Sequence, residues 1–203
     1  KHDLHENTLF LFTSDNGPWL NYGDHAGSAA PLREGKGTMF DGGCREPTLA
    51  WWPGTIPAGS ECNEPVMTID LLPTIAKLID ADLPKHRIDG KDISALLTED
   101  AKSPQEAYYF YYGNQLQAVR QGKWKLHFPH GYRTMAGKPG GTGGIPTNYS
   151  QAKIGLSLFD LHSDIGESTD VKEKFPEIAK RLKSLGEKFN QELQKSKRPA
   201  GRI

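Results

Sequence analysis

The chain has 203 residues, enough for one domain or for one domain with a small appendage. Lys and Arg together number 25, as do Asp and Glu, so the formal net charge is zero. This balance argues against a nucleic-acid partner, because proteins that bind nucleic acid usually carry a basic excess. No apolar run reaches the length of a membrane span. We therefore expect a globular protein that neither binds nucleic acid nor spans a membrane.

The first expected element is a strand over residues 8–13, whose continuous apolar run is typical of a strand buried on both faces of a parallel sheet. It ends at a loop, residues 14–18. Ligands of open α/β sheets bind just beyond the carboxyl ends of strands. Asp15 and Asn16 are therefore well placed to form part of a site.

A glycine-rich loop over residues 19–47 follows, and a loop of this length in a compact protein is either functional or disordered. Its glycines and aromatic neighbours favour the functional alternative. A second strand is expected at residues 48–52. A helix should begin after Asp70 as its N-cap, with an apolar face along residues 71–79. Two parallel-type strands need further neighbours, so we expect upstream sequence, or a partner that carries it, to complete the sheet.

The pattern changes after residue 100. Aromatic residues 107–112 and residues 156–161 are strand-like, and alternation on both sides of Gly122 predicts a hairpin. Residues 129–150 are rich in Gly and Pro and predict a long loop. Apolar residues from 175 to 193 recur at helical spacing, which favours a long helix packed on the small sheet. The sequence therefore predicts two parts: a piece of an α/β domain at residues 1–100 and an antiparallel sheet with one helix at 101–203.

Several segments, in order, resemble type I, formylglycine-dependent sulfatases. The resemblance covers nearly the whole chain, and it implies the C-terminal part of an α/β, alkaline-phosphatase-like sulfatase fold. Any one segment would be weak, whereas five in the correct order are specific. The segments are SDNGP at 14–18, LREGKGTMFDGGCREP at 32–47, WPG at 52–54 with DLLPT at 70–74, AVRQGKWKL at 118–126, and LFDL at 158–161 with GE at 166–167.

The resemblance implies that Asp15 and Asn16 bind a divalent metal, with calcium as the expected ion. A hard cation prefers oxygen ligands, and a carboxylate and an amide carbonyl supply two. In the family, two further aspartates from the first strand complete the site, and those are absent from this chain. The alternative is an Asx-type turn in which both side chains bond the local backbone.

By the same resemblance, Lys36, between two glycines, contacts the sulfate group and stabilises charge at the leaving oxygen. The alternative is a solvated loop lysine. His25 lies between the metal and lysine segments, and it either binds the organic part of the substrate, donates a proton, or is simply a surface histidine.

For several other polar residues, a structural role is expected rather than a catalytic one. Arg45 and Glu46 are expected to form a structural ion pair, and Asp41 to form a turn. A second group lies at the mouth of the expected 129–150 loop, where a surface position is favoured over a place in the substrate cleft. This group is His127, His130 and Arg133.

The nucleophile is missing. These sulfatases use a formylglycine made from the first residue of a Cys/Ser-x-Pro/Ala-x-Arg motif, and neither Cys44 nor Cys62 fits it. No serine fits either. The two cysteines match no metal or redox pattern, and a disulfide between them is not favoured. The chain alone should therefore not turn over substrate.

The resemblance implies that the full-length protein hydrolyses a carbohydrate or aryl sulfate, and that it is exported to the periplasm or extracellular space or is lysosomal. Two alternatives stay open. One is a phosphoester or phosphonate hydrolase of the same superfamily. The other is a non-catalytic, sulfatase-like binding subunit, which the missing nucleophile supports.

Overall fold

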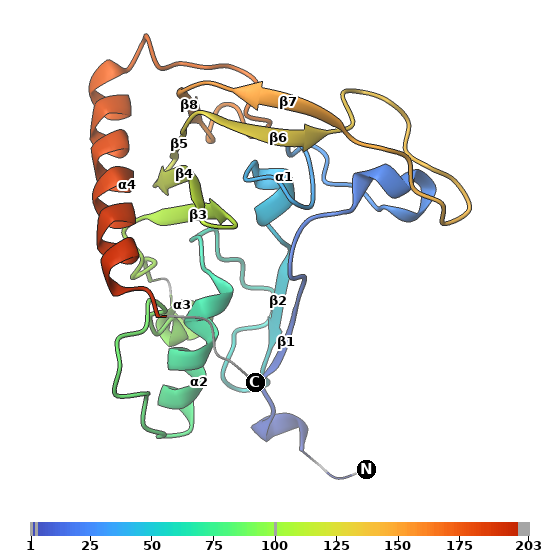
Figure 1. Cartoon of the computed structure of the whole chain (residues 1–203). Helices are drawn as coiled ribbons and strands as arrows, with labels where there is room; N and C mark the ends of the chain where they lie inside the picture. The colour runs from blue at the N-terminus through green and yellow to red at the C-terminus, as the bar shows by residue number, and fades with distance from the viewer. Residues whose placement is uncertain (1, 3, 100, 199–203) are drawn as a thin grey trace. The chain divides into compact units, whose positions relative to one another are not determined.

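The computed structural model (Figure 1) describes residue 2, residues 4–99 and residues 101–198. The chain divides into two compact units. Unit 1 comprises residues 1–13 and 47–106, and unit 2 comprises residues 14–46 and 107–203. The glycine-rich loop thus packs with the C-terminal half of the chain. The domain boundary expected near residue 100 stays a prediction.

Unit 1 contains a two-stranded sheet. Strand β1 (Phe10–Thr13) pairs with β2 (Thr48–Trp51) in antiparallel register, with Phe12 opposite Leu49. The expectation of parallel strands is wrong for this pair, because the two strands run antiparallel. Phe12 is 56% exposed and Leu49 is 66% exposed. Apolar side chains on both strands therefore lack cover among the described residues.

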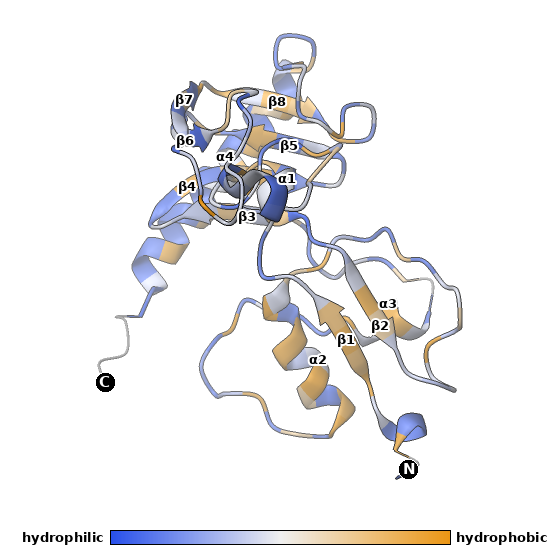
Figure 2. Ribbon diagram, turned by 90° about the vertical axis from the view of Figure 1, so that its right-hand side faces the viewer, coloured by the Kyte–Doolittle hydropathy of each residue, from blue (hydrophilic) through white to orange (hydrophobic). Residues whose placement is uncertain are grey.

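Helix α2 (Leu71–Leu78) confirms the helix expected after Asp70. Asp70 is the N-cap residue, but its buried carboxylate accepts hydrogen bonds from the backbone N–H groups of Met67 and Lys91 rather than from the helix. Figure 2 shows strongly apolar colour on α2, β1 and β2. The other elements of unit 1 are the 3-10 helices η1 (His5–Asn7) and η3 (Thr68–Asp70) and helix α3 (Ser94–Thr98).

Unit 2 is built on a four-stranded antiparallel sheet in the order β3-β4-β5-β8. The predicted hairpin is confirmed, and its turn contains Gly122 at φ +57°, a conformation that favours glycine. Helix α4 (Pro176–Ser196) lies along one side of the sheet (Figure 1). The strands are β3 (Tyr108–Tyr112), β4 (Gln115–Gln121), β5 (Trp124–His127) and β8 (Ser157–Asp160).

The two faces of this sheet differ in chemistry. Val119 and Leu126 pack with Ala179 and Leu182 of α4 in the apolar core. Because successive side chains of a strand point to opposite faces, Lys125 and His127 lie on the other face. That face is covered by the loop before helix α1 (Asp41–Cys44) and by α1 itself.

Residues 129–150 are not simply a loop. Strand β6 (His130–Thr134) pairs antiparallel with β7 (Ser150–Ile154), so the expectation of a loop is wrong at residues 130–134. The surface position favoured for His127, His130 and Arg133 is also wrong. Both histidines are buried, and Arg133 is half-buried on β6. The described helices include none with the length and apolar character needed to cross a membrane.

Candidate functional site

The turn that carries Asp15 and Asn16 follows β1 directly. Asp15 is exposed and Asn16 is half-buried, and the Ser14 hydroxyl donates to the carbonyl of Asn16 at 2.9 Å. The Gly17 N–H donates to the carbonyl of Gly43 at 3.2 Å. A Cβ at Gly17 would collide with the Gly42 carbonyl, so only glycine permits this approach of the turn to α1.

Lys36 is tied to the segment that follows this turn. Its N–H donates to the carbonyl of Pro18 at 3.0 Å, and its ammonium lies 5.0 Å from the ring centroid of Trp19. An ammonium at this distance from an indole is attracted to the negative face of the ring. Lys36 is half-buried. The structure therefore ties the Lys36 backbone to Pro18, which follows Asn16 by two residues in the sequence.

Glu46 does not pair with Arg45, so that expectation is wrong. Arg45 Nη1 instead lies 3.9 Å from Asp41 Oδ2, whereas Glu46 Oε1 is buried and has no hydrogen-bond partner among the described residues. Burial and the negative charge of Asp15 both raise the pKa of Glu46. A cation beside Asp15 would relieve this repulsion.

A calcium ion fits these residues in part. Asp15 and Asn16 offer the oxygen ligands that a hard cation prefers, and the unpaired oxygen of Glu46 leaves negative charge beside them. The described residues contain no group of three or more His, Cys, Asp or Glu side chains arranged to hold a metal. Asp15 and Asn16 would provide two oxygen ligands, fewer than the roughly six to eight that calcium takes.

His25 lies at the end of the 3-10 helix η2 (Leu20–His25). Its side chain is 57% exposed, and Nε2 is 3.6 Å from Asp24 Oδ1. The loop is anchored nearby, because Asn21 is buried and its Nδ2 donates to the Thr147 carbonyl at 2.8 Å. This is a surface position, and a role for His25 with substrate stays a prediction.

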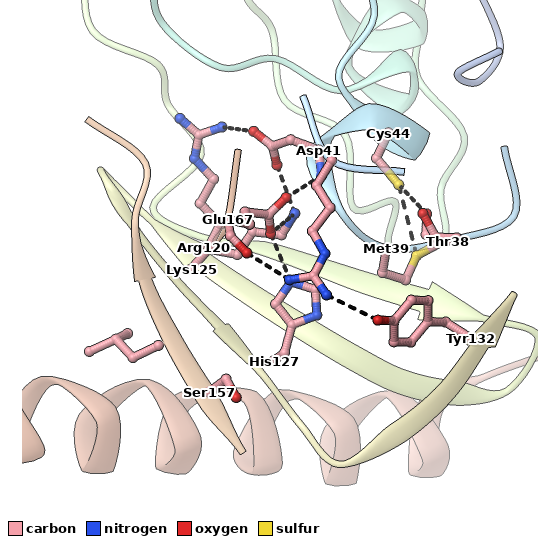
Figure 3. A network of polar contacts seen from close by, with 12 residues as sticks. Thr38, Met39, Asp41, Cys44, Arg120, Lys125, His127, Tyr132, Ser157 and Glu167 are labelled. Atoms are coloured by element: carbon pink, nitrogen blue, oxygen red, sulfur yellow. Dashed lines mark hydrogen bonds and ion pairs between the residues drawn. The ribbon is translucent and has the colours of Figure 1, made fainter. Parts of the chain in front are cut away.

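A buried charge cluster under the loop was missed from the sequence (Figure 3). Lys125 Nζ lies 2.7 Å from Asp41 Oδ1 and 3.0 Å from Glu167 Oε1. Glu167 Oε1 also lies 2.9 Å from His127 Nε2, and Glu167 Oε2 accepts from the Asp41 N–H at 2.6 Å. Asp41 is therefore more than a turn residue, because its carboxylate joins α1 to the middle of the sheet.

The buried groups of this cluster shift one another's pKa values. Burial lowers the pKa of Lys125, but the carboxylates of Glu167 and Asp41 outweigh burial and the net shift is upward. Burial raises the pKa of Glu167, but the Lys125 charge and the His127 hydrogen bond lower it to about 2. For His127, burial dominates and lowers the pKa to about 4. The cluster thus contains the ammonium of Lys125, two carboxylates and a neutral imidazole, and the Arg120 guanidinium lies 3.8 Å from Asp41 Oδ2 (Figure 3).

The cysteines are both free, so the disfavoured disulfide is absent. Cys44 Sγ lies 3.3 Å from the Thr38 carbonyl, and burial raises its pKa to about 11. Since the thiolate is the reactive form, Cys44 is a poor nucleophile where it lies. This agrees with its failure to fit the nucleophile motif.

Family models match most of the chain. Residues 1–81 match the model described as sulfatase, and residues 103–202 match the model for the C-terminal region of aryl-sulfatase. Arylsulfatase A of Bos taurus is 40% identical over 181 residues, covering 85% of this chain and 35% of that protein. Arylsulfatase A of Homo sapiens is 38% identical over 195 residues, covering 90% of this chain and 38% of that protein. The chain thus spans less than two-fifths of these relatives.

Solved structures give the same result. The PsFucS1 sulfatase from Pseudoalteromonas sp. matches 98% of this chain and 39% of its own, with a TM-score of 0.80 and 27% identity. The Ps i-CgsB complex with k-i-k-neocarrahexaose matches 92% of this chain and 37% of its own, with a TM-score of 0.69 and 26% identity. These matches confirm the expected alkaline-phosphatase-like sulfatase fold. Two family models in succession and the shared fold show that this chain belongs to the sulfatase family.

Proposed function

We propose that the whole protein hydrolyses sulfate esters and that this chain supplies part of its active site. The observation that carries the proposal is the tie between Lys36 and Pro18, which brings the lysine segment to the turn of Asp15 and Asn16. A basic side chain and oxygen ligands for a cation then belong to one folded unit, unit 2. This combination suits a sulfate group, whose oxygens need positive charge around them.

Each residue of the site has a distinct role in the proposal. Asp15 and Asn16 would hold calcium, which would supply positive charge to orient and polarise the sulfate. Lys36 stabilises the negative charge that develops on the leaving oxygen. Trp19 restrains the flexible lysine stem through its contact with the ammonium. His25, at the exposed end of η2, would contact the organic part of the substrate.

The nucleophile is expected outside this chain, as a formylglycine, and so we propose that this chain alone is inactive. The substrate class is a carbohydrate or aryl sulfate. Similar proteins are named arylsulfatase, N-acetylgalactosamine-6-sulfatase and steryl-sulfatase. The proposal includes an exported or lysosomal location, which rests on family resemblance.

The remaining sulfatase portion is the proposed cover for the apolar surface of unit 1. Phe10, Phe12, Leu49 and Trp51 on β1 and β2 are each more than half exposed. Burying such side chains contributes on the order of 1.5–3 kcal/mol each. Further strands and helices packed against this sheet would gain that free energy.

The test uses the full-length protein, matured with its modifying enzyme and assayed on an aryl sulfate. Asp15→Ala and Lys36→Ala should each lower kcat/KM by about 100-fold or more, as when a group that stabilises transition-state charge is removed. The exposed residues Asp82 and Lys85, changed to Ala, are matched controls and should have no effect. Equal hydrolysis by all four variants would overturn the site assignment.

A second assay separates the alternatives. Turnover of a sulfate ester should exceed turnover of the matching phosphate ester, and the reverse order would favour a phosphoester hydrolase. A full-length protein without a Cys/Ser-x-Pro/Ala-x-Arg motif, and inactive on both esters, would favour the binding subunit, whose supporting observation is the absence of that motif here.

A further inference from the structure

Arg133 on β6 holds the backbone of Lys36. Its Nε donates to the Lys36 carbonyl at 2.8 Å, and its Nη2 donates to the same oxygen. The guanidinium lies against Gly37, whose φ is +82° and where a Cβ would collide with it. Because the planar guanidinium presents its donors in a fixed fork, it constrains the direction of that carbonyl as well as its distance.

Arg133 is itself braced. Its Cζ lies 4.8 Å from the ring centroid of Tyr149, the residue before β7. The Tyr149 hydroxyl accepts a hydrogen bond from the Asn21 N–H at 3.3 Å. The guanidinium is thus held between an aromatic face and the Lys36 carbonyl, and it has little freedom to swing away.

The residues on both sides of Arg133 form hydrogen bonds with the glycine-rich loop that carries Lys36. The Tyr132 hydroxyl accepts from Arg33 Nη2 at 3.0 Å, and the Thr134 hydroxyl donates to Glu34 Oε1 at 2.8 Å. Glu34 has φ +60°, a conformation that costs free energy for a residue other than glycine. Three successive residues of β6 therefore contact three residues within the segment 33–36 of the glycine-rich loop.

We propose that Arg133 is a positioning residue that fixes Lys36 in place for catalysis. The inference rests on the proposed function of Lys36 as the group that stabilises the leaving oxygen. The ammonium of a lysine is carried on a flexible four-carbon stem. Its position in the site therefore depends on where the lysine backbone is held. A displacement of 1 Å at a reacting centre can cost about 100-fold in rate.

The test compares aryl sulfates with good and poor leaving phenols in the matured full-length protein. Arg133→Gln should lower kcat by about 10- to 100-fold for a poor leaving group and less for a good one, with KM changed little. A poor leaving group depends most on charge stabilisation. A variant that merely folds less well would lose the same factor on every substrate. Lys153→Gln, on β7 of the same ribbon, is the charge-matched control and should leave all rates unchanged.

Lys36→Ala and the double variant complete the experiment. Lys36→Ala should show the same dependence on the leaving group, and adding Arg133→Gln to it should cause no further loss, because the arginine acts through the lysine. If Lys36→Ala shows the dependence and Arg133→Gln does not, the positioning role is wrong. If Lys36→Ala itself shows none, the proposed function of Lys36 fails instead. A full additional loss in the double variant would also overturn the inference.

Discussion

The ammonium of Lys125 lies 2.7 Å from the carboxylate of Asp41, and neither side chain exposes more than 2% of its surface. The pair joins α1, at the end of the Lys36 loop, to strand β5 in the middle of the sheet. Glu167 shares the same ammonium at 3.0 Å. A buried ion pair stabilises the folded state little more than well-packed apolar residues would. Removal of one partner, however, leaves the other charge buried without compensation.

Lys125→Met should therefore destabilise the protein by about 3–5 kcal/mol, because Glu167 would remain buried without its cation. Asp41 would keep only its longer contacts, 3.8 Å to Arg120 and 3.9 Å to Arg45. Urea-induced unfolding measures this as a lower midpoint. Lys123→Met is the control, since Lys123 pairs with Asp160 at 2.7 Å on the same hairpin but its side chain is about half exposed. Its cost should be about 0–1 kcal/mol. Equal costs for the two variants would contradict a stabilising role for the cluster.

The stability of the protein should fall in acid in two windows. The pKa of His127 is lowered from 6.5 to about 4 by burial, so the unfolded chain takes up this proton first as the pH falls. Stability present above pH 6.5 is then lost between about pH 6.5 and 4. The pKa of Glu167 is lowered from 4.5 to about 2, so a second loss follows below pH 4.5. Each window is worth on the order of 3 kcal/mol.

His127→Gln should reduce the first loss of stability and leave the second unchanged; part of the first loss remains, because burial also lowers the pKa of His130 from 6.5. The Gln amide can still donate to Glu167, which keeps that carboxylate satisfied. Thermal unfolding of both proteins between pH 7 and pH 4 is the measurement. A wild-type curve that is flat over this range would show that His127 is not held neutral in the folded state.

Local patterns were enough to predict part of the fold. The β4–β5 hairpin and helix α4 follow from alternation around Gly122 and from helical spacing, and both need only nearby residues. Strand β6 could not be predicted in the same way. Its partner β7 begins about twenty residues later, and Gly and Pro between them are typical of loops.

The candidate site shows the same division. The order of motifs makes Asp15 and Lys36 candidate site residues, which stays a prediction, but the partners of these segments come from distant parts of the chain. Lys125 and Arg133 are charged residues in strands, and single-sequence patterns assign such residues to the surface. Their burial depends on Asp41, Glu167 and the Lys36 carbonyl, which only the folded chain brings to them.

The two cysteines should react with thiol reagents at very different rates. Burial raises the pKa of Cys44 to about 11, so at pH 8 only about one thiol in a thousand is ionised. Cys62 is exposed and should be modified first. Labelling of Cys62→Ser should be slow until the protein unfolds, whereas Cys44→Ser should label quickly. Rapid labelling of Cys62→Ser under native conditions would show that Cys44 is accessible.

The exposed strand residues of unit 1 should become buried in the full-length protein. Leu49 is 66% exposed in this chain, and Leu49→Ala would then cost less than about 0.5 kcal/mol, as for other surface changes. If the remaining sulfatase portion packs on β2, the same change in the full-length protein should cost about 2–5 kcal/mol through lost burial and a new cavity.

Ile145 provides the matched control, because it is 74% exposed and lies on a loop of unit 2. Ile145→Ala should have a negligible effect in the full-length protein. Denaturant unfolding of the two variants beside the wild type is the measurement. A small cost for Leu49→Ala, equal to that for Ile145→Ala, would mean that β2 stays open to solvent and that the proposed packing surface lies elsewhere. A large cost for Leu49→Ala alone would place the missing portion on this sheet, because no contact within the described chain accounts for such a loss.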